Sequence, residues 1–357
     1  MSFKMAIIGY GGMGGHHHEN LKKWNMGIDV VGAYDIRPER AEVMQKNGIQ
    51  AYASPEEIYN DKSIDLVLVA TPNDTHKPYS IACLEAGKNV ICEKPVMLSV
   101  ADLEDVYAAA EKAGKFFTVH QNRRFDTDYL TLRNIIDLKI LNKPFVIESR
   151  VQGSRQYLVG WRAYKPNGGG MLLDWGVHLV DQMLQMIPGK VVSVMTHMHK
   201  QFNEVDDSFT TMFRFDNGVS YLVNITMNCF ITQPRWHACF EDGTVMMGGP
   251  DNQHNWDGVG EIVRLKPDAE NLGFEEVITY TAAGPTRTMS PRPHETVIRM
   301  STPVVVGQWQ DYYKNILACL QGKAAPLVTK DEAIRLLRVI ELMIRSGETG
   351  EMIRCDL

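Results

Sequence analysis

The segment Lys4-Met5-Ala6-Ile7-Ile8-Gly9-Tyr10-Gly11-Gly12-Met13-Gly14 contains the clearest structural motif of this chain. It opens with a short apolar run without polar alternation, which is typical of a strand buried on both faces of a parallel sheet. Glycines follow at once in the spacing G-x-G-x-x-G, and a helical pattern continues to Trp24. We therefore expect a strand, a tight turn and a helix whose free N–H groups and positive dipole end can hold a pyrophosphate.

Each glycine of this motif has its own structural reason. Gly9 permits the tight turn, Gly11 lets the backbone approach the phosphates, and Gly14 allows the helix to pack closely on the strand. Gly12 and Met13 lie between them and are expected to line the same dinucleotide. Because glycine-rich turns are common, the motif needs support from its surroundings.

Asp35 gives that support, since it ends the next expected strand, Ile28–Tyr34, twenty-one residues beyond Gly14. A carboxylate here can accept hydrogen bonds from both ribose hydroxyls and would repel the 2′-phosphate of NADP, so we expect NAD as the cofactor. Arg37 weakens the preference, because an arginine just past this position can accommodate a 2′-phosphate. The alternative is a structural glycine turn beside an unrelated aspartate.

Strand-like runs and helical patterns alternate through the first 120 residues, which predicts a doubly wound parallel sheet of the α/β class. After the first two strands, further strands are expected at 65–70, 89–92 and 116–120. The expected helices are 13–24, 37–47, 55–60, 77–86 and 100–113. We assign an NAD-binding Rossmann domain to residues 1–122.

Beyond residue 123 the pattern changes to two helical stretches and several longer strand-like runs, some joined by hairpin chemistry such as Asp216-Asn217-Gly218. The expected helices are 129–138 and 170–186, and the expected strands are 144–152, 191–199, 209–215, 219–228, 237–240, 244–247 and 261–265. We therefore expect residues 123–357 to form a substrate-binding and oligomerisation domain with a large, mostly antiparallel open sheet. Apart from the strand 261–265, residues 248–303 carry no pattern that assigns them. A homodimer or homotetramer would cover the open face of the sheet.

Composition narrows the class of protein further. The net charge of −6 gives no electrostatic reason to expect nucleic acid or a membrane surface as a partner. The first apolar run is too short for a signal peptide or a membrane span. Six cysteines without paired C-x-x-C spacing suit reduced thiols, so we expect a cytoplasmic protein.

Three consecutive histidines, His16, His17 and His18, invite a metal-binding interpretation. Consecutive helical residues point about 100° apart, so the three cannot converge on one ion. We expect them at the surface or near the phosphates, and we predict no metal site.

Two further clusters carry candidate chemistry. Cys92-Glu93-Lys94-Pro95 lies at the carboxyl end of an expected parallel strand, where open α/β sheets bind ligands. In the glycine-rich block 168–178, Asp174 and His178 are four residues apart and share one face of a helix. Taken singly, Lys94 could be a surface lysine, Asp174 a helix cap and His178 a core histidine. Together with a dinucleotide motif they are better explained as an active site.

With these motifs the sequence resembles the Gfo/Idh/MocA family, which includes glucose–fructose oxidoreductase and inositol dehydrogenases. The resemblance covers nearly the whole chain. It rests on the glycine motif, Ala70-Thr71-Pro72-Asn73 with Thr75-His76, Glu93-Lys94-Pro95, Asn122-Arg123-Arg124-Phe125, Trp161-Arg162, the block 168–178 and Ser346-Gly347-Glu348-Thr349-Gly350.

The resemblance implies that Lys94, Asp174 and His178 form the catalytic group, and that these three bind the substrate together with Arg123. It also implies further residues around the cofactor, with a Lys-Pro bond that is cis in many members. Those residues are Ala70, Thr71, Pro72, Asn73, His76, Glu93, Lys94, Gln121, Trp161 and Arg162.

The residue types fit alcohol oxidation independently of the resemblance. His178 can accept the hydroxyl proton near neutral pH. Lys94 can stabilise the developing alkoxide, and Asp174 can bind a neighbouring hydroxyl or orient the base. We predict an NAD-dependent dehydrogenase or reductase acting at a secondary hydroxyl or oxo carbon of a sugar, glycoside or cyclitol.

Two alternatives come from other classes of protein. An NAD-dependent glycosidase would oxidise the sugar transiently, eliminate the aglycone and reduce the sugar again, and nothing in the motifs excludes it. A non-catalytic dinucleotide-binding sensor is disfavoured, because a sensor has no need of a proton-transfer group.

Overall fold

The computed structural model describes residues 2–248, 256–267, 269, 278–287 and 293–357. Six parallel strands form the first sheet in the order β3-β2-β1-β4-β5-β6. The chain adds β2 and β3 on one side of β1 and then β4, β5 and β6 on its other side, so the strand order reverses between β1 and β4. A ligand crevice is expected at such a switch point. The elements are β1 (Phe3–Ile8), α1 (Gly12–Trp24), β2 (Ile28–Tyr34), α2 (Glu39–Lys46), β3 (Gln50–Ala51), α3 (Pro55–Asn60), β4 (Leu66–Val69), α4 (His76–Glu85), β5 (Asn89–Cys92), α5 (Val100–Ala113) and β6 (Phe117–Val119).

The second sheet has nine strands in the order β16-β13-β12-β11-β7-β10-β9-β8-β17. Only β7 and β10 pair in parallel, so the expectation of a mostly antiparallel sheet is confirmed. The strands are β7 (Pro144–Gln152), β8 (Val191–His199), β9 (Ser208–Phe215), β10 (Ser220–Thr226), β11 (Trp236–Phe240), β12 (Gly243–Met247), β13 (Gly260–Leu265), β16 (Val297–Ser301) and β17 (Ile353–Arg354).

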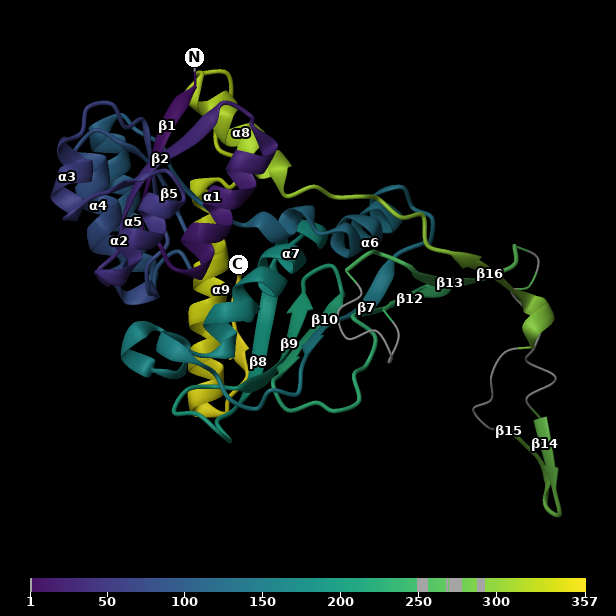
Figure 1. The fold of residues 1–357 in the computed structure, drawn as a ribbon. Coiled ribbons are helices and arrows are strands. Elements are labelled where there is room, and N and C mark those ends of the chain that lie inside the picture. Colours follow the sequence, from purple (N-terminus) through teal and green to yellow (C-terminus); the bar gives the residue numbers. More distant parts are fainter. Residues whose placement is uncertain (1, 249–255, 268, 270–277, 288–292) are drawn as a thin grey trace.

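The segment 248–303 supplies β13, which corresponds to the expected strand 261–265, and β16, which the sequence pattern left unassigned, at one edge of this sheet. It also carries a separate hairpin of β14 (Ile278–Thr281) and β15 (Gly284–Arg287), which lies away from both sheets in Figure 1. Residues 249–255, 268, 270–277 and 288–292 of the segment lie outside the described residues.

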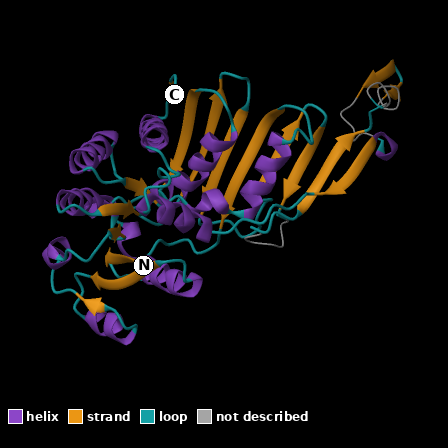
Figure 2. Ribbon diagram, turned by 90° about the horizontal axis from the view of Figure 1, so that it is seen from above, coloured by secondary structure: helices purple, strands orange, loops and turns teal. Residues whose placement is uncertain are grey.

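The helices of the second half are α6 (Thr127–Asp137), α7 (Val177–Met186), α8 (Gln310–Leu320) and α9 (Lys330–Thr349). Helices lie against one face of the large sheet, which Figure 2 shows from above. The covered face contains Phe209 and Phe213, both fully buried, whereas Met212 between them is 44% exposed. The sheet therefore has one packed face and one open face in a single chain.

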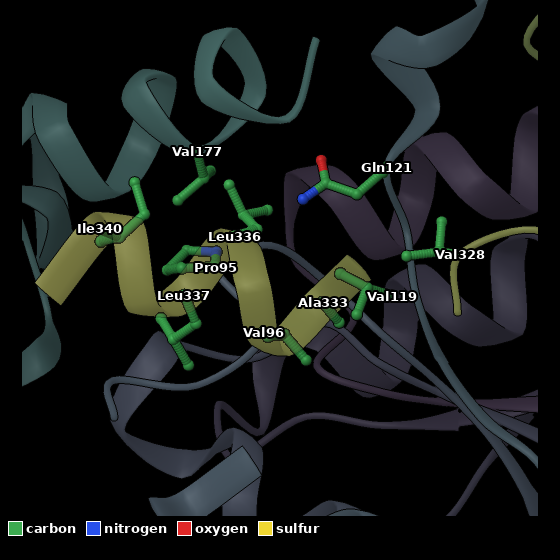
Figure 3. A pocket seen from close by; sticks show the side chains of 10 residues that line it. All are labelled: Pro95, Val96, Val119, Gln121, Val177, Val328, Ala333, Leu336, Leu337 and Ile340. Carbon is green, nitrogen blue, oxygen red and sulfur yellow. The ribbon is translucent and has the colours of Figure 1, made fainter. Parts of the chain in front are cut away.

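Helix α9 passes between the two sheets, where Figure 1 draws it in yellow. It begins with a capping box, in which Thr329 and Glu332 satisfy each other's backbone N–H groups. One face of α9 packs against the turn at Pro95, leaving an apolar gap of only about 10 Å³ (Figure 3). The turn that follows β5 is thus supported from behind by close-packed side chains.

The cysteines and the helices indicate whether the chain holds disulfide bonds or membrane spans. All six cysteines are free thiols. None of the helices within the described ranges combines the length and apolar character needed to cross a lipid bilayer.

Candidate active site

The turn after β1 has the geometry that its glycines predict. Gly9 adopts φ +96°, and a Cβ on it would lie 2.6 Å from the carbonyl oxygen of Ala70. A Cβ on Gly14 would lie 2.3 Å from the carbonyl oxygen of Gly9. A larger residue at position 14 would therefore push α1 away from the turn, and one at position 9 would collide with the backbone that follows β4.

A cavity of about 800 Å³ extends over this turn along the carboxyl edge of the first sheet. Most of the predicted cofactor residues line it, namely Gly9, Gly11, Gly12, Met13, Asp35, Arg37, Ala70, Thr71, Pro72, Asn73, Glu93, Lys94, Trp161 and Arg162. Sequence reasoning missed eight others, which are Tyr34, Ile36, Arg40, Asp74, Thr75, Tyr79, Gly160 and Asn167. Five of these adjoin predicted residues in sequence, and Arg40, Tyr79 and Asn167 reach the wall through tertiary packing.

Three predicted cofactor residues lie outside the cavity wall. Gly14 is buried behind the turn. The imidazole of His76 hydrogen-bonds to the carbonyl oxygens of Pro95 (2.9 Å) and Thr71 (3.0 Å), so it joins two segments of the wall from behind. Gln121 faces the apolar gap beside α9 (Figure 3).

Asp35 and Arg37 form an ion pair at one end of the cavity. The Arg37 Nε lies 3.1 Å from Asp35 Oδ1, and the Arg37 backbone N–H donates to the same oxygen at 3.0 Å. The Asp35 side chain is 6% exposed and that of Arg37 is 48% exposed. This end therefore offers an acceptor suited to a ribose hydroxyl and a half-exposed guanidinium suited to a 2′-phosphate.

Lys94 and Asp174 meet at the other end. The Lys94 Nζ donates to Asp174 Oδ1 at 2.6 Å and to the Asp174 carbonyl oxygen at 2.8 Å, and the Lys94–Pro95 bond is cis. Arg162 Nε lies 3.2 Å from Asp174 Oδ2. Burial alone would raise the pKa of Asp174, but the charges of Lys94 and Arg162 outweigh it and lower the pKa. Asp174 is therefore held as an anion between two cations.

Asp174 lies in a short π-helix, Leu172–Gly176, that leads into α7, where the sequence predicted a single α-helix. Such π-turns are rare and frequent at functional sites. The glycine run before this π-helix allows the chain to pass close to the backbone of Arg162. A Cβ on Gly169 would lie 2.3 Å from the carbonyl oxygen of Arg162. Only glycine allows the approach that brings Arg162 to Asp174.

His178 lies in the first turn of α7 and is buried. Burial lowers its pKa well below the usual value, with further lowering by the charges of Lys94 and Arg123. Its Nδ1 atom has no hydrogen-bond partner among the residues that the structure describes. His178 is thus a neutral imidazole near pH 7, in electrostatic reach of Lys94. Asp181, one turn further along α7, forms an ion pair with Arg124 at 2.7 Å.

Arg123 lies in an aromatic cluster next to this group. Its Cζ atom is 4.2 Å from the ring centre of Trp175 and 4.7 Å from that of Trp256, and its Nη1 donates to Asp126 at 2.9 Å. The indole faces and the carboxylate fix the guanidinium. Trp256 belongs to the segment 248–303, so no local pattern could have linked it to Arg123.

Of the two positions expected for the three histidines, at the surface or near the phosphates, the surface is wrong for two of them. His16 is exposed, but His17 and His18 are buried. The reason is that this side of α1 packs against α8 and the carboxyl ends of β5 and β6. His18 bonds to the Tyr10 hydroxyl at 2.7 Å, and His17 bonds to Glu93 at 2.7 Å.

Comparisons with known proteins agree with this architecture. A model described as an oxidoreductase family with an NAD-binding Rossmann fold matches residues 3–121, and a GFO/IDH/MocA C-terminal domain matches residues 129–246. A scyllo-inositol 2-dehydrogenase (NADP(+)) of Bacillus subtilis is 28% identical over 364 residues, covering 99% of this chain and 96% of that protein. A myo-inositol 2-dehydrogenase of Thermotoga maritima is 34% identical over 191 residues, covering 53% and 56%.

Solved structures give the same result. The crystal structure of an NAD-binding protein from Listeria innocua has a TM-score of 0.86 and 35% identity, and the match covers 99% of this chain and 97% of that one. The two family domains follow each other along the chain as the two sheets do. This protein belongs to the Gfo/Idh/MocA family of oxidoreductases.

Proposed function

We propose that this oxidoreductase moves hydride at a secondary hydroxyl or oxo carbon of a sugar or cyclitol, with NAD as its preferred dinucleotide. The observation that carries the proposal is the contact of Lys94 with Asp174 at one end of a dinucleotide-sized cavity, with a neutral His178 nearby. Inositol dehydrogenases among the relatives support a polyol substrate.

The dinucleotide, when bound, supplies the hydride acceptor or donor, and the side chains handle the proton and the charge. In the oxidative direction His178 takes the hydroxyl proton, because a neutral imidazole can accept it. Lys94 spends two of its three N–H groups on Asp174. The third can donate to the substrate oxygen and stabilise the alkoxide that forms.

Asp174 is best explained as the group that positions Lys94. The contacts of its carboxylate go to Lys94 and Arg162, which fixes the ammonium at the cavity end. We propose that Arg123 binds the substrate from the opposite side, since the tryptophans and Asp126 hold it rigidly while leaving further N–H donors.

Asp35 supports NAD, and Arg37 and Arg40 beside it support some use of NADP. The Bacillus subtilis relative is named as an NADP(+) enzyme, so the preference has to be measured. We further propose a cytoplasmic homodimer or homotetramer that covers the open sheet face, with a domain boundary near residue 122.

A substrate screen tests the function directly. The purified protein is incubated with cyclitols, hexoses, glycosides and their oxo derivatives, each with NAD(H) and NADP(H), and reduced nicotinamide is followed by absorbance. We expect turnover with at least one polyol and its loss in Lys94→Ala. Release of a chromogenic aglycone with catalytic NAD and no net NADH would instead establish a redox-assisted glycosidase.

A further inference from the structure

A chain of buried polar side chains lies behind Lys94 and takes no part in the proposed proton transfer. Its centre is Glu93, whose Oε1 lies 2.7 Å from His17 Nε2 and 2.9 Å from His120 Nδ1. The hydroxyl of Tyr313 lies 2.6 Å from the second nitrogen of His17. All four side chains are at most 6% exposed as residues. They come from α1, the ends of β5 and β6, and α8, so the fold brings them together from distant parts of the sequence.

The separations around Glu93 are those of an ionised carboxylate between two imidazole donors. In this state Oε1 accepts from N–H groups on His17 Nε2 and His120 Nδ1. Tyr313 then donates to the free nitrogen of a neutral His17. Burial by itself would raise the pKa of Glu93, but the charge of His120 and the hydrogen bonds from both histidines outweigh it and hold the pKa well below its usual value.

Glu93 also faces the cofactor cavity. It lines the wall together with Lys94, at the end opposite Asp35, and its Oε2 accepts the Lys94 backbone N–H at 3.1 Å. In a Rossmann domain the pyrophosphate lies at the N-terminus of α1 and the adenosine ribose at the acidic residue after β2. The nicotinamide half therefore belongs at the end where Glu93 and Lys94 lie.

The two oxidation states of a nicotinamide differ in charge. The oxidised ring is a cation and the reduced ring is neutral, so a nearby buried anion favours the oxidised form. Lys94 and Arg162 act in the opposite direction, and Asp174 offsets one of their charges. A substitution of Glu93 alone therefore measures how much its charge contributes to the relative affinity for the oxidised and reduced dinucleotide.

We propose that His17 and His120 are positioning residues that keep Glu93 as an anion at the nicotinamide end, and that this anion raises the affinity for the oxidised dinucleotide relative to the reduced one. The inference rests on the dinucleotide binding of the proposed function and is independent of the substrate.

The same three side chains have donor types that zinc accepts. Two ligand atoms bound tetrahedrally at about 2.0–2.1 Å from zinc would lie roughly 3.3 Å apart. The observed separations of 2.7 and 2.9 Å are instead those of charge-assisted hydrogen bonds. The geometry therefore favours a hydrogen-bonded carboxylate over a metal centre.

Binding constants for oxidised and reduced dinucleotide, measured by calorimetry on the full chain at about pH 8.5, test the proposal without turnover. That pH lies above the range in which imidazoles ordinarily titrate. Glu93→Gln removes the negative charge and keeps the shape of the side chain. We expect the affinity for the oxidised dinucleotide, relative to that for the reduced one, to fall by about tenfold. His17→Leu and His120→Leu, which remove the N–H donors, should move it in the same direction.

Donor-preserving variants provide the matched rescue. Gln carries its amide nitrogen four bonds from Cα, as His carries Nε2, and Asn carries its own three bonds away, as His carries Nδ1. His17→Gln and His120→Asn should therefore keep the parent ratio. His16→Gln, on the exposed side of the same helix, should leave both binding constants unchanged.

Several results would overturn the proposal. If Glu93→Gln weakens both dinucleotides by one common factor, Glu93 has only a structural role. A stoichiometric metal ion in the purified parent that is lost in His17→Leu would replace the hydrogen-bonded carboxylate by a metal site. A parent that binds neither NAD(H) nor NADP(H) would refute the proposed function as well, whereas an unchanged ratio in a protein that binds both forms refutes this inference alone.

Discussion

The ammonium group of Lys94 lies 2.6 Å from Oδ1 of Asp174, eighty residues further along the chain. One residue follows a strand of the first sheet, and the other lies in the π-turn before α7. Each side chain is about one-seventh exposed, so the pair is screened from bulk water but reachable from the cavity. An ion pair in such a position fixes a charge in space at the point where the two halves of the chain meet.

Replacing either partner should therefore impair the chemical step. We expect Lys94→Ala to lower kcat by about 10²–10⁴-fold, because the alkoxide loses its cationic donor. Asp174→Asn should cost less, since Lys94 keeps its bond to the Asp174 carbonyl oxygen. Steady-state kinetics with NAD binding measured in parallel checks this, with Lys190→Ala at an exposed ion pair as the control. Parent-like kcat in Lys94→Ala would contradict the assignment.

His178→Ala should depress kcat by a similar factor of about 10²–10⁴ while leaving NAD affinity little changed, since His178 is not part of the cavity wall. Single-turnover hydride transfer is the decisive measurement, because a histidine that only packs α7 would lower thermal stability and spare this step. A folded His178→Ala enzyme that binds NAD and transfers hydride at the parent rate would exclude His178 as the base.

The pH dependence follows from the lowered pKa of His178. Because burial and nearby cations disfavour the imidazolium, the base is already deprotonated at neutral pH. The oxidative single-turnover rate should rise with pH only well below the ordinary value of about 6.5 and be flat around pH 7–8. A pH profile of the parent and of His178→Gln checks this. An inflection near 6.5 that disappears in the variant would show that the pKa is not lowered.

Local patterns were sufficient for five strands of the first sheet, because parallel strands buried on both faces are short apolar runs, and the glycine motif fixes the turn after β1. The two-residue strand β3 is too short to give such a pattern. Local patterns were not sufficient for His17, whose burial depends on α8, almost three hundred residues away. The same holds for Trp256, which reaches Arg123 from the unassigned segment. The π-turn at Asp174 differs from an α-helix by a single backbone register, which side-chain periodicity cannot resolve.

The proposed preference for NAD rests on Asp35 and Arg37 at the ribose end of the cavity. Asp35→Ser removes the charge that repels a 2′-phosphate, so the ratio of kcat/KM for NAD over NADP should fall. Arg37→Ser removes a cation that can bind the phosphate, so the same ratio should rise. Both variants leave the glycine turn intact and serve as controls for each other. Equal kcat/KM for the two dinucleotides in the unmodified protein would contradict the NAD preference.

The proposed assembly uses the open face of the large sheet. The strand register places Met212, Leu222, Glu148, His237 and Met246 side by side in one row across five strands. Paired residues point to the same side of a sheet, so this row lies on the face that no helix covers, and Met212 and Met246 are 44% and 41% exposed. A second copy would bury both methionines.

Light scattering at micromolar concentration should therefore give the mass of a dimer or tetramer. Met212→Lys should shift the protein toward monomer, because each copy would bury an unpaired ammonium in the interface. Leu138→Lys, at an exposed apolar residue after α6, is the matched control and should leave the mass unchanged. A monomeric parent would contradict the assembly, and an oligomer insensitive to Met212→Lys would locate the interface on another surface of the chain.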